Sequence, residues 1–177
     1  GMNSALTPWM YSKIKKGDIR SMRKVLQLLS IVVVGIAVAL MLISPELVLI
    51  FGSPKYREAV YVIPPVAASV FFIFIYNILS MPQFYYEKTQ FLMAASMAAA
   101  GANVVLNFIF IRLFGYIAAG YTTLACYMLY SVGHYIVSKR ILVNEGIQEN
   151  LMNPGFLLAC SVFLIGASLS LIHISEP

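Results

Sequence analysis

Five long stretches of this 177-residue chain contain no charged residue, and they constrain the fold more than any other feature. They cover residues 25–45, 59–86, 89–111, 113–138 and 150–175, and each is at least 21 residues long. An α-helix crosses the hydrocarbon core of a bilayer with about 20 apolar residues. A helix on the surface of a water-soluble core would carry charges along its outer face. The five stretches therefore predict membrane-spanning helices.

The composition agrees with this interpretation. Only 11% of the residues are charged and 60% are hydrophobic, whereas about a quarter of a soluble domain is charged. Barrel strands need about 10 residues of alternating polarity, so the stretches are too long for a barrel. We expect an all-α, polytopic integral membrane protein. Its four complete spans should lie at about 25–45, 59–82, 90–111 and 116–138, and a fifth should begin at Pro154.

The distribution of basic residues predicts the orientation. If residues 12–24 are cytoplasmic, nine basic residues lie inside and three lie outside. The inside set is Lys13, Lys15, Lys16, Arg20, Arg23, Lys24, Lys88, Lys139 and Arg140, and the outside set is Lys55, Arg57 and Arg112. Cytoplasmic loops carry the excess of Lys and Arg in membrane proteins. We therefore expect a multi-pass protein of the cell's inner membrane, with membrane lipids rather than nucleic acid beside its basic segment.

Both ends of the chain differ from natural termini. Residues 1–24 are expected to hold the end of an upstream helix and the basic segment, because the first residues lack the pattern of a signal peptide. Residues 144–168 should form a cytoplasmic loop and the start of the fifth helix. The last nine residues, LSLIHISEP (169–177), resemble the translation of a transposon adapter used in sequencing libraries. We expect the natural sequence to end near Ser168, so no function is assigned to His173 or Glu176.

Polar side chains recur at helical spacing in three of the predicted spans. They are Ser69, Tyr76, Ser80 and Gln83, continued by Glu87, in the second span, Ser96, Asn103 and Asn107 in the third, and Thr123, Tyr127, Tyr130 and His134 in the fourth. Asn77 lies one position from the first of these stripes. Because polar groups inside a membrane are costly, they usually face a partner or a cavity. Three stripes on neighbouring helices predict a bundle around a wet interior.

Simpler interpretations of these residues stay open. Asn103 and Asn107 would also serve as hydrogen-bonding contacts between helices, at about 0.6 kcal/mol each. His134 lies toward the cytoplasmic end of its span, which favours a polar residue at the membrane interface over a proton relay. Cys126 and Cys160 lie in apolar stretches and are interpreted as small buried residues. No phosphate-binding loop, metal-ligand spacing or nucleophile with its base occurs, so neither an enzyme nor a cofactor is expected.

Several short motifs follow one another along residues 2–143. They are ALTPWMY (5–11), KGD (16–18), FGSPKYREA (51–59), VIPP (62–65), FYYEKT (84–89), NVVLNFIFI (103–111) and FGYIAAGYTT (114–123). In this order and spacing they resemble the C-terminal half of Wzx-type polysaccharide flippases, within the superfamily that also holds MATE exporters and the lipid II flippase. Gly120, where a second Ala is more usual, is a minor departure.

The resemblance implies a function that composition does not. Such proteins have two lobes of helices around a central cavity and move undecaprenyl-pyrophosphate-linked oligosaccharides across the cytoplasmic membrane. Residues 25–143 would be four helices of the C-lobe of a MATE-like transporter, and the N-terminal lobe of the same chain would be its missing partner. The hypothetical substrate-cavity residues are Tyr76, Asn77, Gln83, Asn103 and Asn107. No Lys or Arg lies deep in a span, so contacts with the pyrophosphate would belong to the missing lobe.

Two other classes of function stay open. A cation-coupled MATE-type multidrug exporter would need carboxylates within the membrane, and the spans contain none beyond Glu46 and Glu87 at their ends. A polytopic polysaccharide polymerase or acyltransferase would need long outward loops that carry Arg, His or Asp. The predicted outward loops are short, which argues against such an enzyme.

Overall fold

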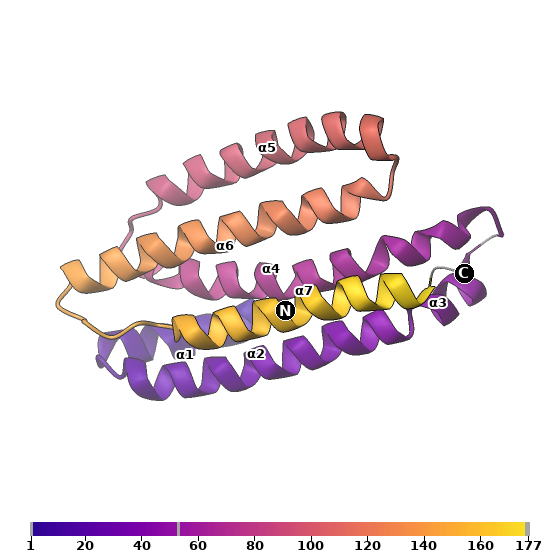
Figure 1. The fold of residues 1–177 in the computed structure, drawn as a ribbon. Helices are drawn as coiled ribbons and strands as arrows, with labels where there is room; N and C mark the ends of the chain where they lie inside the picture. Colours follow the sequence, from indigo (N-terminus) through magenta and orange to yellow (C-terminus); the bar gives the residue numbers. More distant parts are fainter. Residues whose placement is uncertain (1, 53, 176–177) are drawn as a thin grey trace.

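The computed structural model describes residues 2–52 and 54–175, and every regular element in that part is a helix (Figure 1). The elements are α1 (Met2–Lys15), α2 (Ile19–Leu42), α3 (Ser44–Phe51), the 3-10 helix η1 (Pro54–Tyr61), α4 (Ile63–Tyr85), α5 (Gln90–Phe114), α6 (Ala118–Asn144) and α7 (Pro154–Ser175). The all-α prediction is confirmed for these residues. The side chains of Lys55, Arg57 and His173, and residues Glu176 and Pro177, lie outside the described part of the chain.

Three of the described helices are long and apolar enough to cross a membrane. They are α2 with 24 residues, the continuous segment Glu58–Tyr85 with 28 residues, and α5 with 25 residues. The fourth expected span, α6, has 27 residues, but its Thr, Ser, Tyr and His side chains make it less apolar than the other three. In α7, which has 22 residues, the apolar stretch Pro154–Ser170 is the part whose side chains the structure describes.

The helix boundaries match the predicted ones closely at some ends and differ at others. α5 begins at Gln90 and α7 begins at Pro154, as predicted. α2 begins at Ile19, well before the charge-free run, because Ile19 and Met22 are buried while the basic residues beside them face outward. α6 continues to Asn144, because Ile141 and Leu142 are buried against the core.

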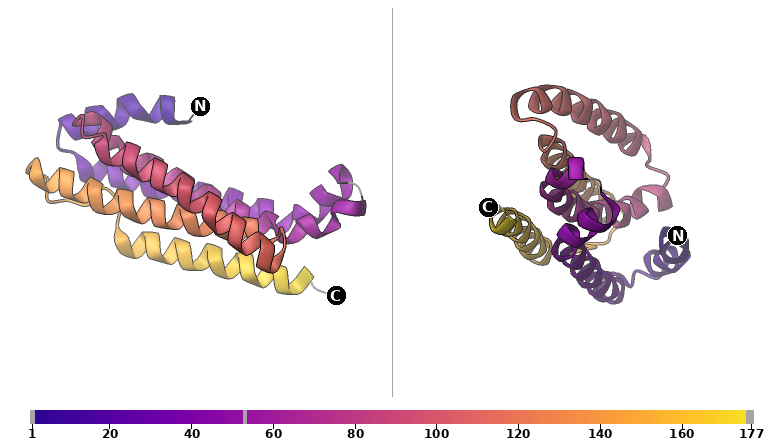
Figure 2. Two further views of the ribbon diagram at one scale, coloured as in Figure 1. Left: turned by 90° about the horizontal axis from the view of Figure 1, so that it is seen from above. Right: turned by 90° about the vertical axis from the view of Figure 1, so that its right-hand side faces the viewer.

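The long helices pack side by side, with α4 at the centre (Figure 1). α6 lies between α4 and α5, while α2 and α7 pack against other faces of α4. The end-on view shows α5 and α7 on different sides of the bundle (Figure 2). The core is formed mainly by α4, whose Phe71, Ile75 and Leu79 are buried on the side that faces α6 and α7. α5 contributes no buried residue, so its outer faces are open to the surroundings.

A glycine permits the closest approach of α6 to α4. A Cβ atom at Gly120 would lie 2.9 Å from Cγ of Pro65 and 3.1 Å from the carbonyl oxygen of Val62. Small residues of this kind let helix backbones approach each other in membrane proteins. Gly120 therefore fixes the distance between the first turns of the two helices.

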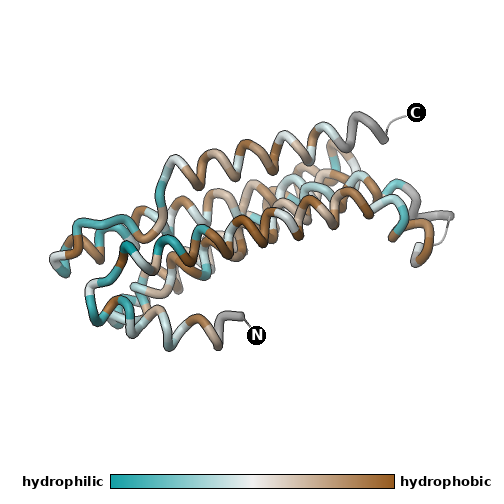
Figure 3. The backbone as a smooth tube through the Cα atoms, turned by 90° about the horizontal axis from the view of Figure 1, so that it is seen from below, coloured by the Kyte–Doolittle hydropathy of each residue, from teal (hydrophilic) through white to brown (hydrophobic). Residues whose placement is uncertain are grey.

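The hydrophilic residues gather at one end of the bundle (Figure 3). Two ion pairs join the connecting segments there, Arg23 with Glu149 at 3.0 Å and Lys88 with Glu145 at 3.1 Å. Near the opposite end, the Tyr116 hydroxyl donates to a carboxylate oxygen of Glu58 over 3.0 Å. The described basic residues of the predicted inside set thus share one end, as the predicted orientation requires.

The turn between α1 and α2 is organised by Asp18. Its carboxylate accepts a hydrogen bond from the backbone N–H of Ser21 at 3.2 Å, so it caps the first turn of α2. Nζ of Lys13 donates to the other carboxylate oxygen over 2.6 Å. The hydrogen bond from Lys13 holds the pKa of Asp18 below its ordinary value. The basic segment therefore folds as the end of α1, a short turn and the start of α2.

Candidate functional site

The polar stripes of α4, α5 and α6 meet at a cavity of about 330 Å³. Its polar lining comes from Tyr76 of α4, Ser96 and Asn103 of α5, and Thr123, Tyr127 and Tyr130 of α6. Ala99, Ala100 and Cys126 complete the wall, and their small side chains leave the space open. No charged side chain among the described residues lines it. The cavity is a neutral, polar space inside an apolar bundle.

Three tyrosines form one wall of this cavity. The ring of Tyr76 stacks on that of Tyr127, with centroids 6.1 Å apart and planes 6° from parallel. Tyr76 also contacts Tyr130 at a centroid distance of 4.7 Å. The Tyr130 hydroxyl shares a hydrogen bond of 2.6 Å with the hydroxyl of Ser96 across the gap to α5. The rings offer apolar faces, and the hydroxyl groups offer donors and acceptors.

A chain of hydrogen bonds fixes the amide side of the cavity. Thr122 of α6 donates its hydroxyl to Oδ1 of Asn107, and Nδ2 of Asn107 donates to Oδ1 of Asn103 over 2.9 Å. The amide of Asn103 is therefore held in place where it lines the cavity. Asn107 lies one turn beyond it and acts as the connection between α5 and α6.

The structure brings together only part of the predicted site. Tyr76 and Asn103 line the cavity, and Asn107 orients Asn103. Asn77 is not among the lining residues, and its amide nitrogen donates to the carbonyl oxygen of Ile73 in its own helix over 2.7 Å. Gln83 does not line the cavity either, because it is completely buried between α4 and α6. Asn77 and Gln83 thus lie outside this cavity, and a contact of theirs with a substrate stays a prediction.

His134 lies inside the bundle, while its expected position near the membrane interface stays a prediction. The side chain is completely buried, and Nδ1 lies 2.7 Å from Nε2 of Gln83. The rings of Tyr76, Phe91 and Tyr130 surround it. Helical spacing placed Gln83 and His134 on polar stripes, but it gave no sign that the two stripes meet at these residues.

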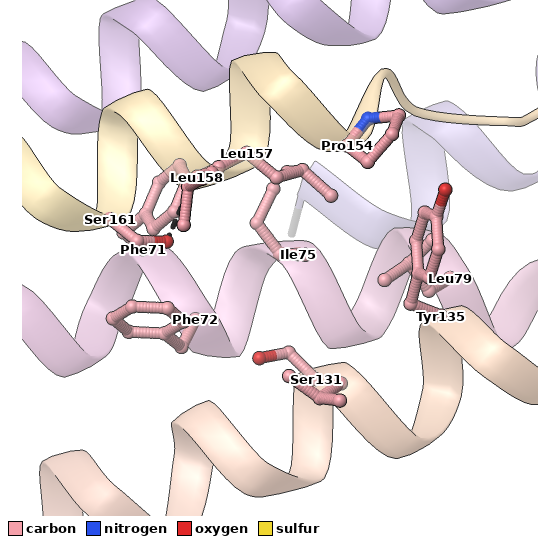
Figure 4. Close-up of a pocket in the computed structure, with 11 residues that line it drawn as sticks. Phe71, Phe72, Ile75, Leu79, Ser131, Tyr135, Pro154, Leu157, Leu158 and Ser161 are labelled. Carbon is pink, nitrogen blue, oxygen red and sulfur yellow. Dashed lines mark hydrogen bonds between the residues drawn. The ribbon is translucent and has the colours of Figure 1, made fainter.

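A second hollow, of about 220 Å³, lies between α4, α6 and α7 and is almost entirely apolar (Figure 4). Phe71, Phe72, Ile75 and Leu79 point into it from α4, and Leu157 and Leu158 face them from α7. The two serines in its wall donate to carbonyl groups of their own helices, Ser131 to Tyr127 and Ser161 to Leu157, each over 2.8 Å. The hollow therefore has the chemistry of a site for a hydrocarbon chain.

The described residues contain no cluster of three or more His, Cys, Asp or Glu side chains able to hold a metal ion. Within that part of the chain, the chemistry of the bundle rests on hydroxyl, amide and aromatic groups. Comparisons with protein-family models, with curated proteins and with solved structures gave no match to this chain.

Proposed function

We propose that this chain is part of a polytopic transporter of the inner membrane, similar to Wzx-type flippases. Its substrate would be an undecaprenyl-pyrophosphate-linked oligosaccharide, moved from the cytoplasmic to the outer leaflet. The observation that carries the proposal is the tyrosine- and amide-lined cavity between α4, α5 and α6. Polar groups at membrane depth are retained where they face a cavity or a transport path.

The lining of the cavity favours a neutral, hydroxyl-rich ligand. Sugar rings present C–H faces that pack on aromatic rings, and Tyr76, Tyr127 and Tyr130 supply such rings. Sugar hydroxyl groups need donors and acceptors, which the amide of Asn103 and the hydroxyl groups provide. A pyrophosphate would instead call for Arg or Lys. The cavity thus suits the glycan part of the substrate, and the pyrophosphate would bind in the other lobe.

The apolar hollow between α4, α6 and α7 supports a lipid-linked substrate. Its wall of Phe71, Phe72, Ile75 and Leu79 suits a polyprenyl chain. It uses different faces of α4 and α6 from the polar cavity, so both hollows exist in one bundle. A drug exporter coupled to cations would need carboxylates near its cavity, and the described lining residues include none. The chemistry of the two hollows therefore favours the flippase over that alternative.

The proposal is tested by export of surface polysaccharide in cells that depend on the full-length protein. Asn103→Ala removes one polar contact with the glycan, worth about 1 kcal/mol, and should lower the export rate about fivefold. Tyr76→Ala removes an aromatic wall as well, so the loss should be about tenfold or more. Lipid-linked oligosaccharide should accumulate in the cytoplasmic leaflet of both variants.

Matched controls separate loss of the site from general damage. Asn144→Ala changes an exposed residue at the end of α6, and Tyr116→Ala changes an exposed tyrosine that does not line the cavity. Both controls should export at the original rate, with all four variants present in the membrane at equal amounts. Unchanged export by Asn103→Ala and Tyr76→Ala would exclude the cavity as the glycan site.

A further inference from the structure

Gln83 and His134 form a buried polar pair in the α4–α6 interface, near the end of α4. They are 51 residues apart in the sequence, and the amide nitrogen of Gln83 lies 2.7 Å from Nδ1 of the imidazole. Both side chains have an exposed fraction of 0%. Because the amide nitrogen donates this bond, Nδ1 is the acceptor and the proton of the neutral ring is on Nε2.

The pair leaves polar atoms without partners. Oε1 of Gln83 and Nε2 of His134 are buried and have no hydrogen-bond partner among the described residues. The hydroxyl of Ser138, one turn beyond His134 on α6, is in the same condition. An unpaired buried polar atom costs about 1–3 kcal/mol. A site that served packing alone would be more stable with apolar side chains of the same size, so these atoms indicate a second state that uses them.

The surroundings of His134 are aromatic, and no carboxylate contacts it among the described residues. Three ring centroids lie around the imidazole, at 4.5 Å for Tyr130, 5.5 Å for Phe91 and 5.9 Å for Tyr76. Aromatic faces attract cations at such distances. No ion pair with His134 occurs in the described part of the chain, so a charge there would be balanced by rings and an amide dipole rather than by a carboxylate.

We propose that the Gln83–His134 pair is a proton-binding site within the α4–α6 interface. A proton taken from water adds to Nδ1 of the neutral ring, which then carries one positive charge and donates from both nitrogens. The Gln83 amide turns over about its terminal bond, so that Oε1 accepts from Nδ1–H. The orphaned oxygen is thereby paired, and the hydrogen bond of the pair is kept with its direction reversed. Ser138, one turn further along α6, has a buried hydroxyl that accepts as well as donates.

The proton site and the cavity share two side chains. Tyr76 and Tyr130 contact the His134 ring and also line the cavity. A charge on the imidazole draws these rings toward it, and Tyr130 is hydrogen-bonded to Ser96 of α5. Protonation therefore acts on the cavity wall through contacts already present. The site binds its proton without any transported substrate, so the inference does not depend on the proposed glycan.

Few other charged groups reach this position. Among the described residues, the phenols of Tyr76 and Tyr130 are the titratable groups whose rings contact the imidazole, and α5 contributes the ring of Phe91. Glu87 and Lys88 lie just beyond α4, and Lys139 and Arg140 lie past His134 on α6, all exposed at the hydrophilic end of the bundle. Among the described residues, Gln83 and the three aromatic rings are thus the side chains that contact the imidazole.

The test is a pH titration of the imidazole nitrogens by NMR, in the full chain reconstituted in lipid nanodiscs. His173→Gln leaves His134 as the sole histidine, so its signals need no further assignment. At high pH we expect one protonated nitrogen and one unprotonated nitrogen. As the pH falls, the unprotonated signal should move reversibly to the protonated position while the helical circular dichroism stays constant.

Two substitutions of Gln83 identify its role. Gln83→Met keeps the length of the side chain but removes the oxygen that would accept from Nδ1–H of His134. The midpoint of the His134 titration should therefore fall by about one pH unit, a tenfold loss of proton affinity. Gln83→Glu keeps an acceptor and adds a negative charge, so the midpoint should rise. Ser69→Ala, a buried change elsewhere on α4, should leave the midpoint where it was. The proposal is overturned if His134 stays neutral over the range in which the helices persist, if its charging coincides with unfolding, or if Gln83→Met and Gln83→Glu share the original midpoint.

Discussion

Thr122, near the start of α6, donates its hydroxyl to the side-chain oxygen of Asn107 on α5. This bond and the one from Asn107 to Asn103 place the amide wall of the cavity. Because α5 has no buried side chain, these contacts fix its rotation against α6 more than apolar packing does. Their loss should loosen the cavity before it unfolds the bundle.

A double-mutant cycle on Thr122→Val and Asn107→Leu measures this contact. The coupling free energy should be about 0.6 kcal/mol, the usual value for hydrogen bonds between membrane helices. It is obtained from denaturant unfolding of the reconstituted chain. Thr123→Val is the matched control, because its side chain has no hydrogen bond to Asn107 among the described contacts. Equal coupling in both cycles would show that the Thr122 bond does not hold α5.

Substitution by alanine should have opposite effects on the free energy of unfolding at two glycines in different surroundings. Gly120→Ala drives a methyl group against Pro65 and Val62, so the free energy of unfolding should fall by about 1–3 kcal/mol. Gly101→Ala on α5 meets no atom within 4 Å and should raise it by about 0.5–1 kcal/mol, since alanine favours helix. Thermal melts followed by circular dichroism compare the two. An unchanged melting temperature for Gly120→Ala would contradict the close approach of α6 to α4.

The turn at Asp18 should make part of the stability depend on pH. The folded pKa of Asp18 lies below its ordinary value of 3.8, so its ionised form stabilises the folded chain above that value. The contribution is lost as the pH falls from about 3.8 through the lower folded pKa. Asp18→Asn keeps a capping oxygen but cannot ionise. The melting temperature of the original chain should exceed that of Asp18→Asn at pH 7, and the difference should shrink at pH 3.

Orientation can be measured with single cysteines after Cys126 and Cys160 are replaced by alanine. We expect Arg112→Cys to react with a membrane-impermeant maleimide in intact cells. Lys24→Cys and Arg140→Cys should react only after the cells are permeabilised, because both belong to the basic set that the predicted orientation places in the cytoplasm. Reaction of Lys24→Cys in intact cells, with Arg112→Cys protected, would invert the proposed topology.

Sequence patterns predict the presence of each helix more accurately than the residues at which it begins and ends. Charge-free runs predict α5 and α7 closely, since turn and proline residues mark their starts. They misplace the start of α2, where Ile19, Met22 and Leu26 are buried at helical spacing while Arg20 and Lys24 between them are exposed. A rule based on charge begins the helix after Lys24, although the buried apolar face extends back to Ile19.

The site shows the same limit. Spacing within one helix selects Tyr76 and Asn103 as members of polar stripes, and the cavity contains both. Spacing within one helix does not predict how α4 is rotated against α6. That rotation decides that Gln83 contacts His134, whereas the amide of Asn77 donates to a carbonyl group of its own helix. The small residues Ala99, Ala100 and Cys126 carry no polar signal, yet their size creates the space. The space between two helices depends on how they pack against each other, so it cannot be predicted from the sequence of either helix alone.

The exposure of α5 has a consequence for how the protein assembles. Its apolar length is enough to hold it in a bilayer by itself, whereas its position beside α6 depends on a few polar bonds. Insertion and docking are therefore separate steps for this helix. An intermediate with α1, α2, α4, α6 and α7 already packed would have the apolar core but not the tyrosine-lined cavity, because α5 supplies the last wall.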